Sequence, residues 1–218
     1  MPGALVAGAS GGLGPAVVDE LAASGWQVTG VDRHAHERDE VGSMEADLLD
    51  PEAARRAVEA VEDLRAVVNL VGGFAMGPKV EDLELADFEK MLRLNVVPAF
   101  NLARAAMPRL VAAGGGAFVC VSARAALQPF PGASGYITGK AGVLALVKAL
   151  DAEYRAAGVR SNAVLPSAID TAANRESMPN ADWAKWVPPA QIARVIRFLC
   201  SEDSAPTSGA AIPVYGRA

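Results

Sequence analysis

The stretch Gly8-Ala9-Ser10-Gly11-Gly12-Leu13-Gly14 decides the fold of this chain. It follows the short apolar run Leu5-Val6-Ala7, which is typical of a buried strand, and it opens a helical pattern over residues 13–24. Glycine permits a tight turn and a close approach of a diphosphate to the backbone, and the free N–H groups of a helix N-terminus attract phosphate. The spacing is Gly-x-x-x-Gly-x-Gly, and the strand–turn–helix context favours a dinucleotide-binding turn over a purely structural one.

Apolar and helical stretches continue to alternate beyond this turn. Strands are expected at 27–31, 66–71, 117–121, 161–165 and 210–214, and helices at 80–112 (interrupted near Pro98 and Pro108), 136–156 and 188–200, with a further helix starting at Asp50-Pro51-Glu52. Central strands that are apolar on both faces, with helices between them, predict a parallel sheet covered on both sides. We therefore expect a doubly wound, Rossmann-type α/β fold in which residues 1–218 form one domain.

The composition excludes several classes of protein. The chain has 218 residues, of which 51% are hydrophobic and 21% charged, so it is neither disordered nor a charge-rich coiled coil. The net charge is −5 and no basic block exists, which argues against nucleic acid and anionic membrane as partners. Cys120 and Cys200 lie in apolar runs and are expected to be buried, reduced thiols. With no secretory signal or membrane span visible, a soluble, cytoplasmic protein is expected.

Two acidic residues follow the glycine turn. Asp32 ends the second expected strand, where a carboxylate can accept hydrogen bonds from the adenosine ribose and repel a 2′-phosphate. It favours NAD(H) as cofactor, but the adjacent Arg33 could meet a phosphate, so NADP(H) is not excluded. Asp47 is placed either at the adenine edge or simply in a loop or cap.

The second chemical motif is Tyr136-Ile137-Thr138-Gly139-Lys140. Positions four apart lie on one face of a helix, and an ammonium near a phenol stabilises the phenolate. Such a phenol can exchange a proton with a carbonyl, an alcohol or an imine while hydride moves. Taken alone, the pattern is short, and a surface Tyr–Lys pair is the favoured interpretation.

In combination, the motifs resemble the short-chain dehydrogenase/reductase family over essentially the whole chain. The matching positions, in order, are the glycine turn, Asp32, Asn69-x-x-Gly72-Gly73, Asn95, Tyr136-x-x-x-Lys140 and Pro166 to Thr171.

This resemblance implies a role for each position. Tyr136 would donate or accept the proton, Lys140 would hold the nicotinamide ribose and tune the phenol, and Asn95 would support a water relay to the lysine. The cofactor would contact a further set of residues, namely Gly8, Ser10, Gly11, Gly12, Leu13, Gly14, Asp32, Asp47, Gly72, Pro166, Ile169 and Thr171, with no metal required. The resemblance also implies a homodimer or homotetramer formed through the helices near 90–112 and 136–156.

One position departs from the family pattern. The usual catalytic serine, thirteen residues before the tyrosine, is replaced by Ala123. Ser122 is one residue away, which on a strand points it to the opposite face, and Ser134 is a further candidate. Unless one of these serines replaces it, the site lacks one donor that would stabilise a developing oxyanion.

The quinonoid dihydropteridine reductases resemble this pattern because they keep the tyrosine and lysine without the serine. The similarity extends to 71–74, 123–127, 165–171 and 174–183. Their substrate is an electron-poor ring that takes hydride without a polarised ketone.

Residues 167–187 are expected to form a lid over the substrate, because they follow a strand at the ligand-binding edge of the sheet. Trp183 and Trp186 could stack on a flat ring or anchor the lid, and Arg175 could bind an anionic group or make a surface pair. His34 and His36 lie in a charged, solvated loop rather than a metal site.

Together these features predict an NAD(H)-dependent oxidoreductase acting on a small conjugated carbonyl, quinonoid or dihydropterin-like substrate. A reductase of ordinary ketones and alcohols, or a nucleotide-sensing protein without catalysis, is the alternative.

Overall fold

The computed structural model describes residues 1–34 and 42–217. It contains a seven-stranded sheet in the order β3-β2-β1-β4-β5-β6-β7, in which every neighbouring pair is parallel. The strands are β1 (Gly3–Ala7), β2 (Gln27–Asp32), β3 (Gly42–Glu45), β4 (Leu64–Asn69), β5 (Gly116–Val121), β6 (Val159–Pro166) and β7 (Ala211–Val214). The expected doubly wound fold is confirmed, and the short, mostly exposed strand β3 is the one strand that its sequence did not predict.

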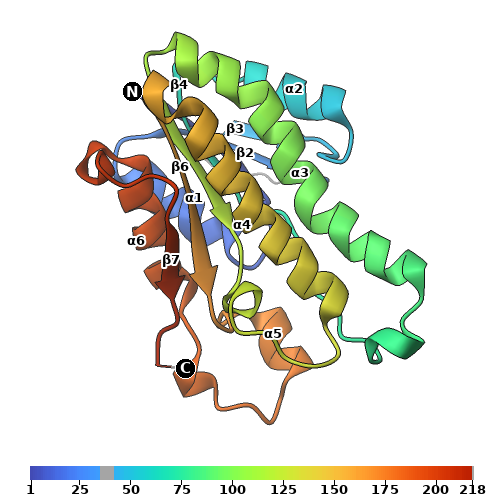
Figure 1. Cartoon of the computed structure of the whole chain (residues 1–218). Coiled ribbons are helices and arrows are strands. Elements are labelled where there is room, and N and C mark those ends of the chain that lie inside the picture. Colours follow the sequence, from blue (N-terminus) through green and yellow to red (C-terminus); the bar gives the residue numbers. More distant parts are fainter. Residues whose placement is uncertain (35–41, 218) are drawn as a thin grey trace.

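Helices cover both faces of this sheet (Figure 1). They are α1 (Gly14–Ala23), α2 (Pro51–Glu59), α3 (Leu85–Ala112), α4 (Ser134–Tyr154), α5 (Ala172–Ser177) and α6 (Pro189–Cys200). Helices α1 and α6 pack on one face, and α2, α3 and α4 pack on the other. Successive side chains of a strand point to opposite faces, so along β1 Ala4 and Val6 pack against α1 and α6, whereas Leu5 and Ala7 pack on the side of α2, α3 and α4.

Helix α3 corrects the expected interruption near Pro98 and Pro108. It runs for 28 residues with both prolines inside it. Each proline removes one backbone hydrogen bond, but Pro98 is buried in a helix that packs along α2 and α4, and this packing outweighs the local loss.

Small residues let α3 and α4 approach closely. A Cβ added at Gly135 would lie 3.1 Å from the Cβ of Met91, and one added at Gly139 would lie 3.1 Å from the Cβ of Asn95. This contact fixes the rotation of α4 about its axis. It therefore also fixes where Tyr136 and Lys140 point.

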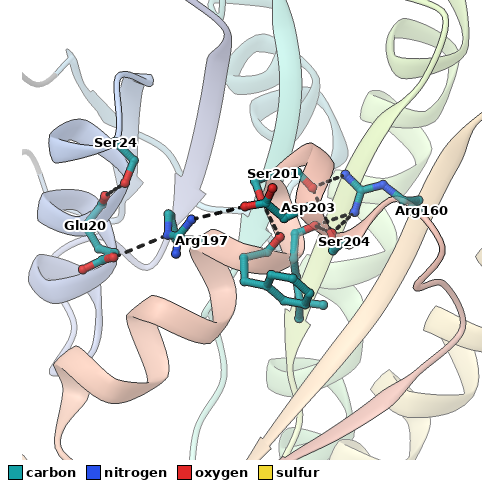
Figure 2. Close-up of polar contacts among 9 residues, drawn as sticks. Glu20, Ser24, Arg160, Arg197, Ser201, Asp203 and Ser204 are labelled. Carbon is teal, nitrogen blue, oxygen red and sulfur yellow. Dashed lines mark hydrogen bonds and ion pairs between the residues drawn. The ribbon is translucent and has the colours of Figure 1, made fainter.

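A polar network connects β6, α6 and α1 near the amino end of β6 (Figure 2). Arg160 of β6 is buried, and its guanidinium donates to Leu199 O at 2.7 Å and to Ser201 O at 3.1 Å, at the C-terminal end of α6. Arg197 of α6 lies 3.5 Å from Glu20 of α1. The network joins β6, α6 and α1 into one unit.

Cys120 and Cys200 are both buried free thiols, as predicted. Within residues 1–34 and 42–217, no helix combines the length and the apolar character that crossing a bilayer requires.

Candidate active site

The glycine turn joins β1 to α1 at the carboxyl edge of the sheet, and its shape requires glycine. Gly8 has φ +85°, a conformation that other residues rarely adopt. A Cβ at Gly14 would lie 2.2 Å from Ala9 O, and one at Gly12 would lie 2.8 Å from Thr171 Cγ2. Side chains at these positions would fill the turn.

The turn also presents backbone donors. Ser10 N–H donates to Asp32 Oδ2 at 3.0 Å. In the part of the chain that the structure describes, the N–H groups of Gly12 and Leu13, just before α1, have no acceptor. Two free donors at the positive end of a helix suit a diphosphate, so the turn fits the phosphates of a dinucleotide.

Asp32 lies beside this turn at the end of β2. Besides the bond from Ser10, its Oδ1 accepts the N–H of Arg33 at 2.8 Å, so the carboxylate organises the turn and keeps lone pairs for a ribose. Asp47 accepts Leu49 N–H at 2.9 Å in the loop before α2, as its loop alternative predicts. A contact between Asp47 and adenine stays a prediction.

Tyr136 and Lys140 lie one turn apart on α4, as the spacing predicts. Lys140 is buried, and its Nζ donates to Val121 O at 3.0 Å. Burial lowers the pKa of Lys140 to about 8, an effect that the nearby Cys120 opposes. Burial raises the pKa of Tyr136 to about 12. The expected lowering of the phenol pKa by Lys140 is therefore not found here, because desolvation dominates.

Asn95 and Gly72 lie against Lys140. Asn95 Oδ1 accepts Gly73 N–H at 3.2 Å, while Nδ2 donates to Gly73 O at 3.1 Å and to Met91 O at 2.9 Å. A Cβ at Gly72 would lie 2.6 Å from Asn95 Oδ1 and 2.8 Å from Lys140 Nζ. Asn95 thus clamps the loop after β4 onto α3. Both its amide hydrogens are used, and its role in a water relay stays a prediction.

The two serines considered as replacements for the missing one lie in different surroundings. Ala123 is buried in extended backbone after β5. Ser122 is also buried, and its Oγ donates to Lys140 O at 2.8 Å, so it faces α4, as the one-residue slip predicts. Ser134 stands two residues before Tyr136 at the start of α4 and lines the same pocket, and its buried Oγ has no hydrogen-bond partner among the described residues, so its role stays a prediction.

The segment after β6 returns to the glycine turn. Pro166 ends β6, and Ile169 forms a parallel bridge to Val187. Thr171 caps α5 by accepting Asn174 N–H at 3.2 Å, and its methyl group lies against Gly12. The structure thus brings Thr171 to the expected cofactor cleft.

The aromatic residues of the expected lid hold the segment together. Arg175 donates to Asp170 at 2.5 and 2.8 Å and lies over the ring of Trp183, 4.8 Å from its centroid. Trp183 Nε1 donates to Met178 O at 3.0 Å. Trp186 is buried. Of the alternatives given above, these contacts favour an anchoring role for the two tryptophans and a surface ion pair for Arg175.

A pocket of about 180 Å³ lies beside Tyr136. Its lining comes from the loop after β4, the start of α3 and residues 132–136. A larger depression of about 670 Å³ at the amino edge of the sheet is lined by Arg65, Arg155 and Arg160. We place the substrate in the smaller pocket, because the larger one is remote from Tyr136.

Sequence reasoning missed two neighbours of Lys140. These are the carbonyl of Val121 and the buried thiol of Cys120, whose pKa burial raises to about 12. A backbone acceptor leaves no signal in the sequence, and Cys120 looked like an ordinary core residue. His34 is exposed, whereas His36 lies outside the described residues. Residues 1–34 and 42–217 hold no cluster of metal-binding side chains.

Comparisons with known proteins agree with this geometry. The model of the family described as short chain dehydrogenase matches residues 3–182. The 2-(R)-hydroxypropyl-CoM dehydrogenase of Xanthobacter autotrophicus is 29% identical, over 98% of this chain and 96% of its own length. The cyclohexanol dehydrogenase of an Acinetobacter species is 30% identical, over 98% and 93%. A solved putative short-chain alcohol dehydrogenase from Sinorhizobium meliloti 1021 superposes with a TM-score of 0.89 at 28% identity, over 99% and 95%.

Proposed function

This chain belongs to the short-chain dehydrogenase/reductase family and is an oxidoreductase of that class, and we propose that it reduces a conjugated carbonyl, quinonoid or dihydropterin-like substrate with NADH. One observation carries the proposal. The Tyr136–Lys140 pair lies on α4 at the same edge of the sheet as the free N–H groups of the glycine turn. A proton donor and a diphosphate cradle thus lie at one edge of the sheet.

Tyr136 is the acid in this proposal. A phenol with a pKa near 12 is protonated at neutral pH, so Tyr136 holds the proton that the reduced substrate needs. Lys140, with a pKa near 8, is mostly charged at pH 7 and stabilises negative charge as the phenol gives up its proton. The nicotinamide cofactor that this family uses supplies the hydride when bound.

NADH is favoured over NADPH because of Asp32. Its carboxylate lies at the end of β2 beside the turn, where it would accept ribose hydroxyls and repel a 2′-phosphate.

The substrate class follows from Ala123. With no hydroxyl at this position, the reacting oxygen or nitrogen depends chiefly on Tyr136 as its side-chain donor. An electron-poor, conjugated ring stores negative charge in its own π-system and needs less help. Ordinary ketones and alcohols are the second candidate class, favoured by names such as cyclohexanol dehydrogenase among the relatives. Retention of Tyr136 and Lys140 together argues against a non-catalytic nucleotide sensor.

We also propose that the enzyme is a cytoplasmic homodimer or homotetramer that pairs through α3 and α4. Phe100 on α3 is half exposed, which leaves apolar surface for a partner.

The Tyr136→Phe variant tests the mechanism. It should bind NADH with unchanged affinity, measured by cofactor fluorescence, while turnover on a panel of quinones, dihydropterins and ketones falls about 10²- to 10⁴-fold. Equal turnover in the variant would refute Tyr136 as the proton donor. Tight binding by the native protein with no turnover on any member of the panel would favour the sensor.

A further inference from the structure

We propose that the substrate carries an apolar ring or chain beside its reducible group, and that Phe74 is the residue that selects for it. This inference rests on the proposed function and names the substrate class of the same site. The apolar mouth, as we call it, consists of Phe74 and Met76, side chains that are 57% and 59% exposed.

Phe74 connects this mouth to Tyr136. It follows Gly72 and Gly73 at the end of β4, and its ring meets the ring of Tyr136 edge to face, with centroids 4.9 Å apart and an interplanar angle of 89°. Yet Phe74 is 57% exposed, so its open face is available to a ligand. A flat or apolar group placed on that face lies next to the proton-donating phenol.

The loop that carries the mouth is held in place by the loop before α4. Gly77 N–H donates to Gly132 O at 2.7 Å, which joins the loop after β4 to the loop before α4. The Cε of Met76 lies 3.4 Å from the Cβ position of Gly132. Met76 also lines the 180 Å³ pocket together with Tyr136. The mouth is thus a fixed surface continuous with the pocket.

The polar groups around the mouth leave its apolar character intact. Asp87 and Lys90 of α3 line the pocket but are exposed, so they are solvated at its rim. Arg175 on the lid is paired with Asp170. Exposed apolar side chains that gather beside a catalytic group mark a site where binding removes them from water.

The test is the specificity constant for a homologous series. Native enzyme is assayed for NADH oxidation with 2-alkyl-1,4-benzoquinones whose linear chains grow from one to five carbons, with the non-enzymatic rate subtracted. Burying a methylene contributes roughly 0.8 kcal/mol when complete, so kcat/KM should rise about two- to fourfold per carbon in this half-open mouth. A chain of equal length ending in a carboxylate should lose that gain.

Phe74→Ala, at an exposed position, should reduce the gain per carbon to less than half of the native value, while Phe74→Leu should retain most of it. Phe198→Ala is the matched control: Phe198 is a 39% exposed phenylalanine on α6, and its removal should leave the series unchanged.

The outcomes separate the two proposals. No NADH oxidation with any quinone, dihydropterin or ketone overturns the proposed function. Oxidation with equal kcat/KM along the series, or with a preference for the carboxylated chain, overturns the apolar mouth alone. An unchanged gain in Phe74→Ala removes Phe74 from the selection.

Discussion

Replacing Lys140 with methionine should change how stability depends on pH. Burial lowers the pKa of Lys140 from 10.5 to about 8 in the folded protein. The difference corresponds to roughly 3 kcal/mol, which is the cost of keeping this ammonium charged inside the fold at pH 7. Methionine is similar in length, is apolar and carries no such cost.

The sign of the effect follows from proton binding. Between pH 8 and 10.5 the unfolded chain holds a proton on Lys140 that the folded protein has lost, so folding becomes more favourable as pH rises. From pH 7 to pH 9.5 the native protein should therefore gain about 2 kcal/mol relative to Lys140→Met.

Urea unfolding of both proteins at the two pH values measures this difference. Cys120 and Cys200 have pKa values raised to about 12 by burial, so both proteins lose stability above pH 9, and this loss cancels in the comparison. Because Cys120 lies near Lys140, the same pair of proteins in a Cys120→Ala background serves as control. Parallel stability curves for native and variant protein would show that Lys140 is not desolvated as described.

Three further predictions concern the neighbours of this pair. Ala123→Ser restores the family hydroxyl and should raise kcat/KM for simple ketones about tenfold or more, with little change for quinones; equal gains on both would contradict the role assigned to the missing donor. Ser122→Ala removes the hydrogen bond to Lys140 O and should lower the free energy of unfolding by about 1–3 kcal/mol while kcat stays within about twofold, measured by urea unfolding and steady-state kinetics. Asp32→Ala should raise the ratio of kcat/KM for NADPH to that for NADH about tenfold, and an unchanged ratio would mean that Asp32 acts only on the turn.

The periodicity of the sequence was sufficient for the fold. Both core faces of β1 and the helix that follows the glycine turn are local patterns, and each appears where expected. The expected break in α3 was wrong because proline reports a local penalty, whereas the buried length of that helix is a property of the whole fold. Strand β3 escaped notice because a short, exposed edge strand has little apolar patterning.

The relative positions of Tyr136, Lys140 and Ser122 were predictable from the sequence, but the pKa values at the site were not. Spacing placed Tyr136 and Lys140 one turn apart, and the one-residue slip of Ser122 was read correctly. The pKa values depend on burial by loops that come from distant parts of the chain, so the raised pKa of Tyr136 could not be derived from the spacing. Likewise, the sequence does not tell which neighbour caps α5: Thr171 does so, and Asp170 pairs with Arg175.

The contacts of Arg160 and Arg197 indicate that the fold depends on α6 and the residues just after it. Residues after 182 lie beyond the stretch that the family pattern matches, yet α6 supplies Ile192, Ile196 and Leu199 to the layer that supports the glycine turn. Cutting the chain there would expose the apolar face of the sheet that α6 covers and remove the acceptors of Arg160. A fragment ended at the boundary of the matched pattern should therefore be insoluble rather than merely inactive.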